Sequence, residues 1–252
     1  SRMKRNKQKM GSVGKKVGII ISIFLLVILG GEAVYDSVIS YNLAVNSNKN
    51  FEKVETKALA RNIEGRFKKS YEAGAALIAA TRAEMFINSE ANRSRQTITE
   101  IVMQIYLTNP ELSGLGIYFE PNGFDGRDAD YVTADNKTGA MVTYVSGEKD
   151  DLKIKTLDYH IGEPWYTVPV STGKDSLTAP YISSVGKLVV TYAMPIIFDG
   201  KVIGAINADI DIDNISDELA KDSTNNEDDF SVLLTDSGIV VANSIDKTGI
   251  MK

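Results

Sequence analysis

The feature that most constrains the fold is a pair of apolar stretches separated by Asp199-Gly200. Residues 187–197 are rich in β-branched and aromatic side chains, and residues 201–210 are also mostly apolar. An Asp-Gly pair between two such runs is the strongest short-range signal for a β-hairpin. The sequence therefore predicts two consecutive antiparallel strands joined by a tight turn.

The segment before this hairpin contains Trp165, Tyr166 and Tyr181 and is interrupted by three prolines. Aromatic side chains on proline-stiffened loops beside a sheet can form the wall of a pocket, because they combine large apolar faces with polar tips. The same residues could instead fill the core beneath a long loop. The pattern alone leaves both interpretations open.

Asp209 lies late in the second apolar run, in the sequence AINADID. A carboxylate near the end of a buried strand is costly unless it meets a cation or several hydrogen-bond donors. Asp209 is therefore a candidate for holding an ammonium group. The alternative is an aspartate that caps the following turn.

Seven cations precede the first acidic residue and lead into an uncharged apolar run over residues 17–31. With the apolar residues just beyond, the run approaches the roughly 20 residues that cross a bilayer. The basic flank predicts that residues 1–16 are cytoplasmic and the remainder extracytoplasmic. A cleaved signal peptide competes with this interpretation. No convincing small-x-small cleavage site follows, which favours an uncleaved transmembrane helix over residues 17–35.

Residues 36–90 lack proline and carry apolar side chains at helical spacing, which predicts one long helix. Such a helix could form a homodimer interface near the membrane, or it could be a scaffold without a signalling role. A shorter helix is predicted over residues 97–107, ended by Asn109-Pro110. Further elements are predicted as strands at 114–119 and 140–146, a helix at 214–221 and a second hairpin within 230–243. Residues 152–157 could be another short strand or the start of the loop that carries the aromatic residues.

The residues that carry chemistry indicate binding rather than catalysis. The chain has no cysteine, and His160 is its only histidine, which is too little for a triad or a multi-histidine metal site. No phosphate-binding glycine loop is present. Asp125, Asp128 and Asp130 raise the question of calcium, but they lack the spacing of an EF-hand loop. We therefore expect no catalytic residue, no metal and no cofactor. The acidic body also argues against nucleic-acid binding.

Several of these segments together resemble the membrane-distal module of a double Cache domain, the extracytoplasmic sensor of many bacterial chemoreceptors. The matching residues are Trp165-Tyr166, Pro180-Tyr181-Ile182, the strand 188–195, Gly204-Ala205-Ile206 leading to Asp209-Ile210, and GLGIYFEPNGFDGRD at 114–128. The resemblance covers most of residues 32–252. It implies an α+β fold: a long N-terminal helix, then a PAS-like antiparallel-sheet distal module over residues 91–221. Residues 222–252 would be a connector and the truncated start of a second PAS-like module, so we expect a fragment of a longer receptor.

The resemblance also implies a set of site residues. In family members that sense amino acids, an arginine two positions before the Trp-Tyr pair holds the ligand carboxylate. The Trp-Tyr pair walls the site, and a tyrosine after the proline and a late aspartate hold the amino group. Trp165, Tyr166, Tyr181 and Asp209 match, and Tyr192 is a further candidate. The arginine position is occupied by Glu163, which removes the bidentate partner of a carboxylate and could assist a cationic amine instead.

The sequence thus predicts the ligand-sensing region of a methyl-accepting chemotaxis protein in the inner membrane, with a small polar metabolite, such as an amine, as its ligand. The same sensor could serve a histidine kinase or a diguanylate cyclase. From another class, the chain could be a membrane-anchored structural or adhesion domain that binds no small molecule. A surface hydrolase lacks a recognisable nucleophile and base.

Overall fold

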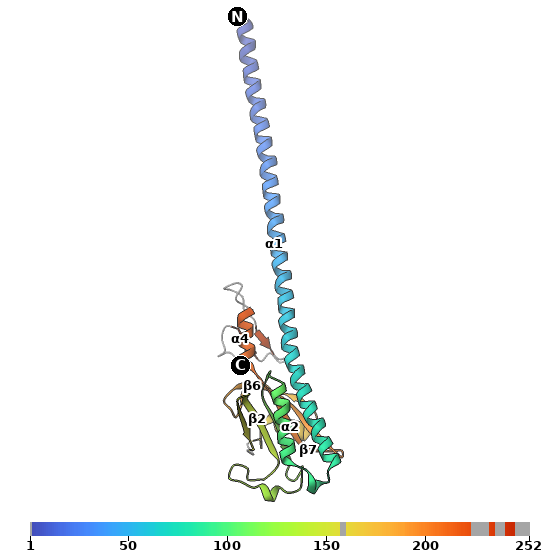
Figure 1. The fold of residues 1–252 in the computed structure, drawn as a ribbon. Coiled ribbons are helices and arrows are strands. Elements are labelled where there is room, and N and C mark those ends of the chain that lie inside the picture. Colours follow the sequence, from blue (N-terminus) through green and yellow to red (C-terminus); the bar gives the residue numbers. More distant parts are fainter. Residues whose placement is uncertain (1, 157–159, 223–231, 235–239, 245–252) are drawn as a thin grey trace. The chain divides into compact units, whose positions relative to one another are not determined.

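The structure is a computed structural model that describes the backbone of residues 2–156, 160–222, 232–234 and 240–244 (Figure 1). The chain divides into two compact units, Ser1–Leu59 and Ala60–Lys252. The first unit consists of the N-terminal part of helix α1 (Arg2–Ile87). The second contains the sheet and all other helices of the described residues. The predicted mixed α and β fold is confirmed.

The membrane-spanning segment predicted over residues 17–35 lies within α1, where nearly all side chains fall outside the described part of the structure. Among the described residues, none of the helices combines the length and the apolar character that crossing a bilayer requires. Further along the first unit, Val38, Tyr41 and Leu43 are exposed.

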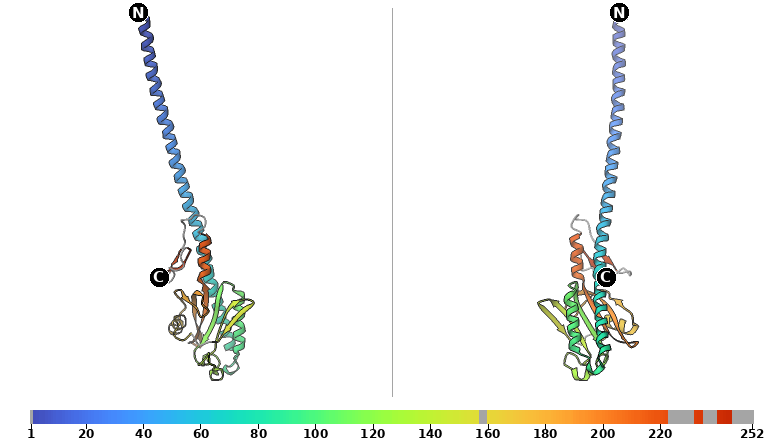
Figure 2. Two further views of the ribbon diagram at one scale, coloured as in Figure 1. Left: turned by 90° about the vertical axis from the view of Figure 1, so that its left-hand side faces the viewer. Right: turned by 45° about the vertical axis from the view of Figure 1, so that its right-hand side comes forward.

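Helix α2 (Arg95–Thr108) and the part of α1 that belongs to the second unit lie side by side and cover one face of the sheet, called here the α1/α2 face (Figure 2). Along α1 the buried side chains recur every three to four residues from Ala73 through Leu77 to Met85, as expected for one helical stripe against a core. Gly74 brings α1 very close to the sheet, since a Cβ there would lie 2.5 Å from Ile206 Cδ1. Helix α2 follows the short 3-10 helix Glu90–Asn92.

The second unit contains one seven-stranded antiparallel sheet. Its order is β3-β2-β1-β7-β6-β4, and β5 also pairs with β6. The strands are β1 (Leu112–Phe119), β2 (Val142–Glu148), β3 (Asp151–Lys155), β4 (Ser176–Leu177), β5 (Tyr181–Ile182), β6 (Leu188–Phe198) and β7 (Lys201–Asp211). The predicted strands between residues 114 and 197 and the one at 201–210 are all present, with ends shifted by a few residues.

The central hairpin forms as the Asp-Gly pair predicts. Phe198 pairs with Lys201, and the two turn residues Asp199 and Gly200 have φ angles of 48° and 73°. A two-residue turn with both φ angles positive matches the twist of the flanking strands, which is why Asp-Gly favours it. Strands β6 and β7 therefore form the long central ladder of the sheet.

The opposite face of the sheet, called here the α3 face, is covered by a helix that the sequence analysis placed in a loop. Helix α3 (Pro164–Thr172) packs over β6 and β7 and contains Trp165 and Tyr166. Pro164 occupies a first-turn position, where the missing N–H costs no hydrogen bond and the fixed φ suits a helix. Gly173 ends α3 in the left-handed region and donates to the carbonyl of Pro169. The prediction of a proline-stiffened loop was thus wrong for Trp165 and Tyr166, because proline also starts helices.

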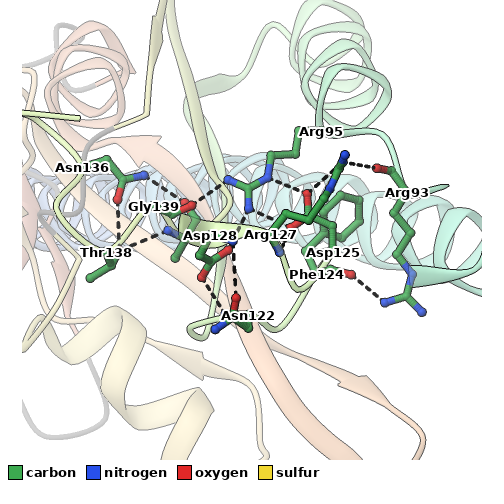
Figure 3. A network of polar contacts seen from close by, with 11 residues as sticks. Arg93, Arg95, Asn122, Phe124, Asp125, Arg127, Asp128, Asn136, Thr138 and Gly139 are labelled. Atoms are coloured by element: carbon green, nitrogen blue, oxygen red, sulfur yellow. Dashed lines mark hydrogen bonds and ion pairs between the residues drawn. The ribbon is translucent and has the colours of Figure 1, made fainter. Parts of the chain in front are cut away.

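The aspartate-rich segment after β1 is tied to the start of α2 by an arginine (Figure 3). Arg95 donates to both oxygens of Asp125 at 2.8 Å and to Asp128 at 2.7 Å, while its guanidinium lies 3.8 Å from the Tyr131 ring centre. Burial alone would raise the pKa of Asp125, but the hydrogen bonds from Arg95 and Arg127 lower it below its usual value. Two of the three aspartates that raised the calcium question are thus paired with arginine, and Asp130 is exposed.

The chain leaves the sheet through helix α4 (Ile212–Asp222), which is joined to α1 by an ion pair between Arg66 and Glu218. A second hairpin pairs β8 (Val232–Leu234) with β9 (Val240–Asn243), as predicted. Its Asp-Ser-Gly turn and most of the predicted connector lie outside the described residues.

Candidate ligand-binding site

A cavity of about 200 Å³ lies on the α3 face of the sheet. Its floor comes from β2 and β7, and its walls come from the start of α3 and from β5 with the turn that follows it. The described lining residues are Tyr144, Glu163, Trp165, Tyr181, Ile182, Ser183, Ser184, Asn207 and Asp209. The site is therefore assembled from four segments spread over 66 residues of sequence.

Strand register places Asp209 at the floor of this cavity. Asp209 pairs with Gly114 on β1 and with Thr191 on β6, so the three residues share the α3 face. The carboxylate is 1% exposed. Thr191 Oγ1 donates to one carboxylate oxygen at 2.6 Å, and Tyr144 Oη donates to the other at 2.8 Å. The neighbouring polar groups thus hold the carboxylate in place from two strands.

Tyr181 extends this hydrogen-bond chain to the wall of the cavity. Its hydroxyl lies 2.7 Å from Thr191 Oγ1. Because the single hydroxyl hydrogen of Thr191 is directed to Asp209, the Tyr181 hydroxyl is the donor in this contact.

Two glycines on β1 make room for these side chains. A Cβ on Gly114 would lie 2.0 Å from Tyr144 Oη, so the absence of a side chain lets Tyr144 reach across β1 to Asp209. A Cβ on Gly116 would lie 2.4 Å from Asn207 Oδ1. The two glycines therefore leave space above β1 for the side chains of Tyr144 from β2 and Asn207 from β7.

Asp209 is an unusual carboxylate because it is buried among neutral groups. Burial raises its pKa to about 6, although the hydrogen bonds from Thr191 and Tyr144 act in the opposite direction. None of the described residues that line the cavity is a lysine, arginine or histidine. Lys155 donates to the backbone carbonyl of Ser184, which lines the cavity. Within the described residues, the carboxylate has hydrogen-bond donors but no cationic partner in the cavity.

Asn207 adds a second acceptor beside Asp209. It is 2% exposed, and its amide nitrogen lies 3.4 Å from Asp209 Oδ1. Its side-chain oxygen is buried and has no hydrogen-bond partner among the residues that the structure describes. An unsatisfied buried acceptor costs free energy unless a donor reaches it. The cavity therefore presents acceptors suited to a ligand with several N–H donors.

Four of the six candidate site residues from the sequence line this cavity. Glu163, Trp165, Tyr181 and Asp209 come together, with Glu163 immediately before the first turn of α3. The Trp165 ring is nearly fully buried and packs 4.8 Å from Tyr118, so it forms both wall and core. The two readings of the aromatic residues, pocket wall and core filling, both describe Trp165.

The other two candidates lie elsewhere. Tyr166 faces the neighbouring aromatic core, where its hydroxyl donates to Glu120, and burial together with that carboxylate raises its pKa. Tyr192 points to the α1/α2 face, because alternate residues of a strand face opposite sides and its neighbour Thr191 faces Asp209 on the α3 face. There the Tyr192 ring packs edge-on against Tyr71 of α1, at 5.5 Å between ring centres.

The sequence analysis missed Tyr144, Asn207 and Thr191. The two-residue spacing of Asn207 and Asp209 on one predicted strand was an available signal, since it places both on one face. Tyr144 had no such signal, because its contact depends on the pairing of β2 with β1.

A second cavity of about 370 Å³ adjoins the first at Glu163, Trp165 and Tyr181, which line both. Its other described lining residues come from α3, β4 and the segment before β5: Pro164, Val168, Ser176, Leu177, Thr178, Ala179 and Pro180. Carbon atoms dominate this lining. The polar cavity at Asp209 and this apolar cavity thus meet at the same aromatic pair.

Comparison with known proteins finds similarity to bacterial chemoreceptors. Residues 98–217 match the family described as methyl-accepting chemotaxis protein-like, first PDC sensor domain. A 162-residue stretch is 28% identical to the methyl-accepting chemotaxis protein TlpQ of Pseudomonas aeruginosa strain PAO1. That stretch covers 54% of this chain and 23% of TlpQ, so the match spans about a quarter of the curated relative.

Solved structures share the fold. The extracellular domain assigned to histidine kinase mmHK1S-Z3 superposes with a TM-score of 0.62 at 25% identity, covering 78% of this chain and 73% of that one. The periplasmic sensory domain of the Campylobacter jejuni chemoreceptor Tlp1 gives a TM-score of 0.63 at 17% identity, covering 78% and 72%. The matched regions of these relatives are sensor domains rather than enzymes.

Proposed function

We propose that this chain is the extracytoplasmic ligand-sensing region of a transmembrane methyl-accepting chemotaxis protein, because residues 98–217 match the first PDC sensor domain of methyl-accepting chemotaxis protein-like sequences. Residues 1–16 would be cytoplasmic, residues 17–35 would cross the inner membrane, and residues 36–90 would form the ectodomain helix of a homodimer. Residues 91–221 would be the distal sensing module, and residues 222–252 would begin a proximal one.

The ligand of the distal module is a small cationic amine. The observation that carries this proposal is the buried carboxylate of Asp209, which meets only neutral donors in a cavity whose described lining contains no basic side chain. An ammonium group would neutralise Asp209 and supply the donors that Asn207 Oδ1 lacks. Glu163 adds a second carboxylate to the same lining, which opposes a ligand carboxylate and favours a cation.

Strand β6 connects the site to the long helix. Thr191 contacts Asp209 in the cavity, and the next residue, Tyr192, packs on Tyr71 of α1. A ligand that moves Thr191 by a fraction of an ångström therefore also moves a side chain that packs on α1. Binding can signal along α1 only to the extent that the ligand prefers one of two arrangements of this packing.

The test is calorimetric titration of the 252-residue chain in detergent micelles with n-butylamine, butan-1-ol and butyrate at pH 7.5. We expect saturable binding of the amine and little or none of the alcohol and the acid. The substitution Asp209→Asn should weaken amine binding by at least about 30-fold, because removing one partner of a buried charge pair costs 2–5 kcal/mol.

The matched control is Asp211→Asn. Asp211 lies two residues further along β7 and is nearly as buried, but it pairs with Lys187 and does not line the cavity. This variant should bind n-butylamine as the unsubstituted chain does. Equal affinity for butylamine and butanol, or equal losses in the two variants, would remove the case for an amine at Asp209.

The similarity to the extracellular domain assigned to a histidine kinase supports one alternative. The same sensing module could feed a kinase rather than a chemotaxis output. Both outputs use the site described here, so the calorimetric test applies to either. Absence of any small-molecule binding would instead favour a structural or adhesion domain.

A further inference from the structure

The apolar cavity next to Asp209 carries an inference about the ligand's shape. A polar cavity of about 200 Å³ and an apolar one of about 370 Å³ share Glu163, Trp165 and Tyr181. The smaller cavity holds the buried acceptors, Asp209 and Asn207, at one end. The larger cavity has room for several methylene groups at the other.

The lining of the larger cavity is apolar although it reaches the surface. Val168 on α3 and Leu177 on β4 are 40% and 51% exposed, and Pro164, Ala179 and Pro180 also contribute. Apolar side chains left half-exposed around a hollow are typical of a surface that an apolar group covers. The proline residues limit backbone motion around the hollow, so less entropy is lost when it is filled.

We propose that this second cavity binds the apolar arm of the amine held by Asp209, so that the ligand is a primary monoamine with an alkyl or aryl arm. This inference rests on the proposed function. The ammonium group lies on Asp209, the start of the arm passes between Trp165 and Tyr181, and the rest of the arm covers Val168 and its neighbours. The aromatic pair then contacts the arm and also the cation, which its ring faces attract.

A diamine of the same length is a poorer ligand by this reasoning. Its second ammonium group would enter a cavity whose only carboxylate among the described lining residues is Glu163, at the end shared with the first cavity. The side chains of the other described lining residues carry no charge, and their polar groups are the hydroxyls of Ser176 and Thr178. Leaving water for such surroundings disfavours a cation strongly.

The experiment is calorimetry of the full chain in micelles with the series ethylamine, butylamine and hexylamine, and with 1,6-diaminohexane. We expect the dissociation constant to fall about fourfold for each added CH₂ that enters the cavity. We expect hexylamine to bind more tightly than 1,6-diaminohexane.

Two substitutions of one residue test the location. Val168→Gln makes the lining polar and should reduce the gain per CH₂, and Val168→Trp fills the hollow and should weaken hexylamine while leaving ethylamine unchanged. Val168 projects from a short helix and is half-exposed, so both replacements are compatible with the fold. Ile197→Gln is the matched control, because Ile197 is 39% exposed on β6 and lines neither cavity.

The outcomes separate the inference from the proposed function. If ethylamine binds but affinity does not rise with chain length, or if the diamine binds more tightly than hexylamine, the amine site stands and the apolar arm is wrong. If no member of the series binds, the proposed amine ligand fails and the arm fails with it. Equal effects of Val168→Trp and Ile197→Gln on the affinity for hexylamine would also contradict the proposal that the second cavity binds an apolar arm.

Discussion

The buried carboxylate of Asp209 gives this protein a specific dependence of stability on pH. Its pKa is about 6 in the folded protein and 3.8 in an exposed carboxyl group. The folded state therefore holds the proton more tightly than the unfolded chain does. The stability that protonated Asp209 contributes is complete below about pH 3.8 and is lost as the pH rises through about 6. At 1.36 kcal/mol per tenfold difference in affinity, the full loss is about 3 kcal/mol.

The substitution Asp209→Asn isolates this contribution because the amide has nearly the same shape and does not ionise. Urea unfolding should be followed by the fluorescence of Trp165, which is the only tryptophan and lies in the wall of the same cavity. Between pH 4.5 and 7.5, the free energy of unfolding of the unsubstituted chain should fall by about 2 kcal/mol relative to Asp209→Asn, which is the share of the linkage inside that window.

The variant Asp125→Asn is a control for a general effect of pH on stability. Asp125 has a lowered pKa because of its arginine partners, so its contribution is present at neutral pH and is lost as the pH falls. The stability difference between the unsubstituted chain and Asp125→Asn should therefore stay nearly constant between pH 4.5 and 7.5 and should fall only below about pH 3.8. A difference between the unsubstituted chain and Asp209→Asn that stays flat across the window would refute the reasoning, because Asp209 would then titrate as an exposed group.

Two further predictions follow from the packing of the second unit. Gly114→Ala should weaken n-butylamine binding and lower the free energy of unfolding in urea by about 1–3 kcal/mol, since its Cβ meets Tyr144 and leaves the buried carboxylate short of a donor. Gly65→Ala, where a Cβ meets nothing within 4 Å, should be neutral or stabilising by up to about 1 kcal/mol, and equal losses in both variants would contradict the account. Arg95→Lys should lower the stability measured by thermal unfolding by about 2–3 kcal/mol, because lysine cannot donate to both oxygens of Asp125, and an unchanged melting temperature would show that this pairing is not stabilising.

Much of the fold is readable from the sequence because it depends on local patterns. The Asp199-Gly200 turn, the apolar stripe of the long helix and the alternation along the strands follow from backbone geometry at neighbouring positions. Helix α3 was missed because Pro164 serves equally well in a loop and in the first turn of a helix.

The site could be predicted only in part, because only some of its residues stand out by a local pattern. Asp209 could be selected because a carboxylate in an apolar strand is locally anomalous. Its partner Tyr144 could not, because their contact requires a strand register that no local pattern specifies.

The sequence by itself determined most of the helices and strands, except α3 and the short strands β4 and β5, and it showed which polar residue sits where apolar ones are expected. Tertiary structure decided which side chains meet. A shift of one residue in strand pairing exchanges the two faces of a strand, so Thr191 contacts Asp209 while Tyr192 contacts α1. That choice depends on the sum of packing across the whole sheet, and for this reason the acceptor-lined cavity could be identified only from the assembled fold.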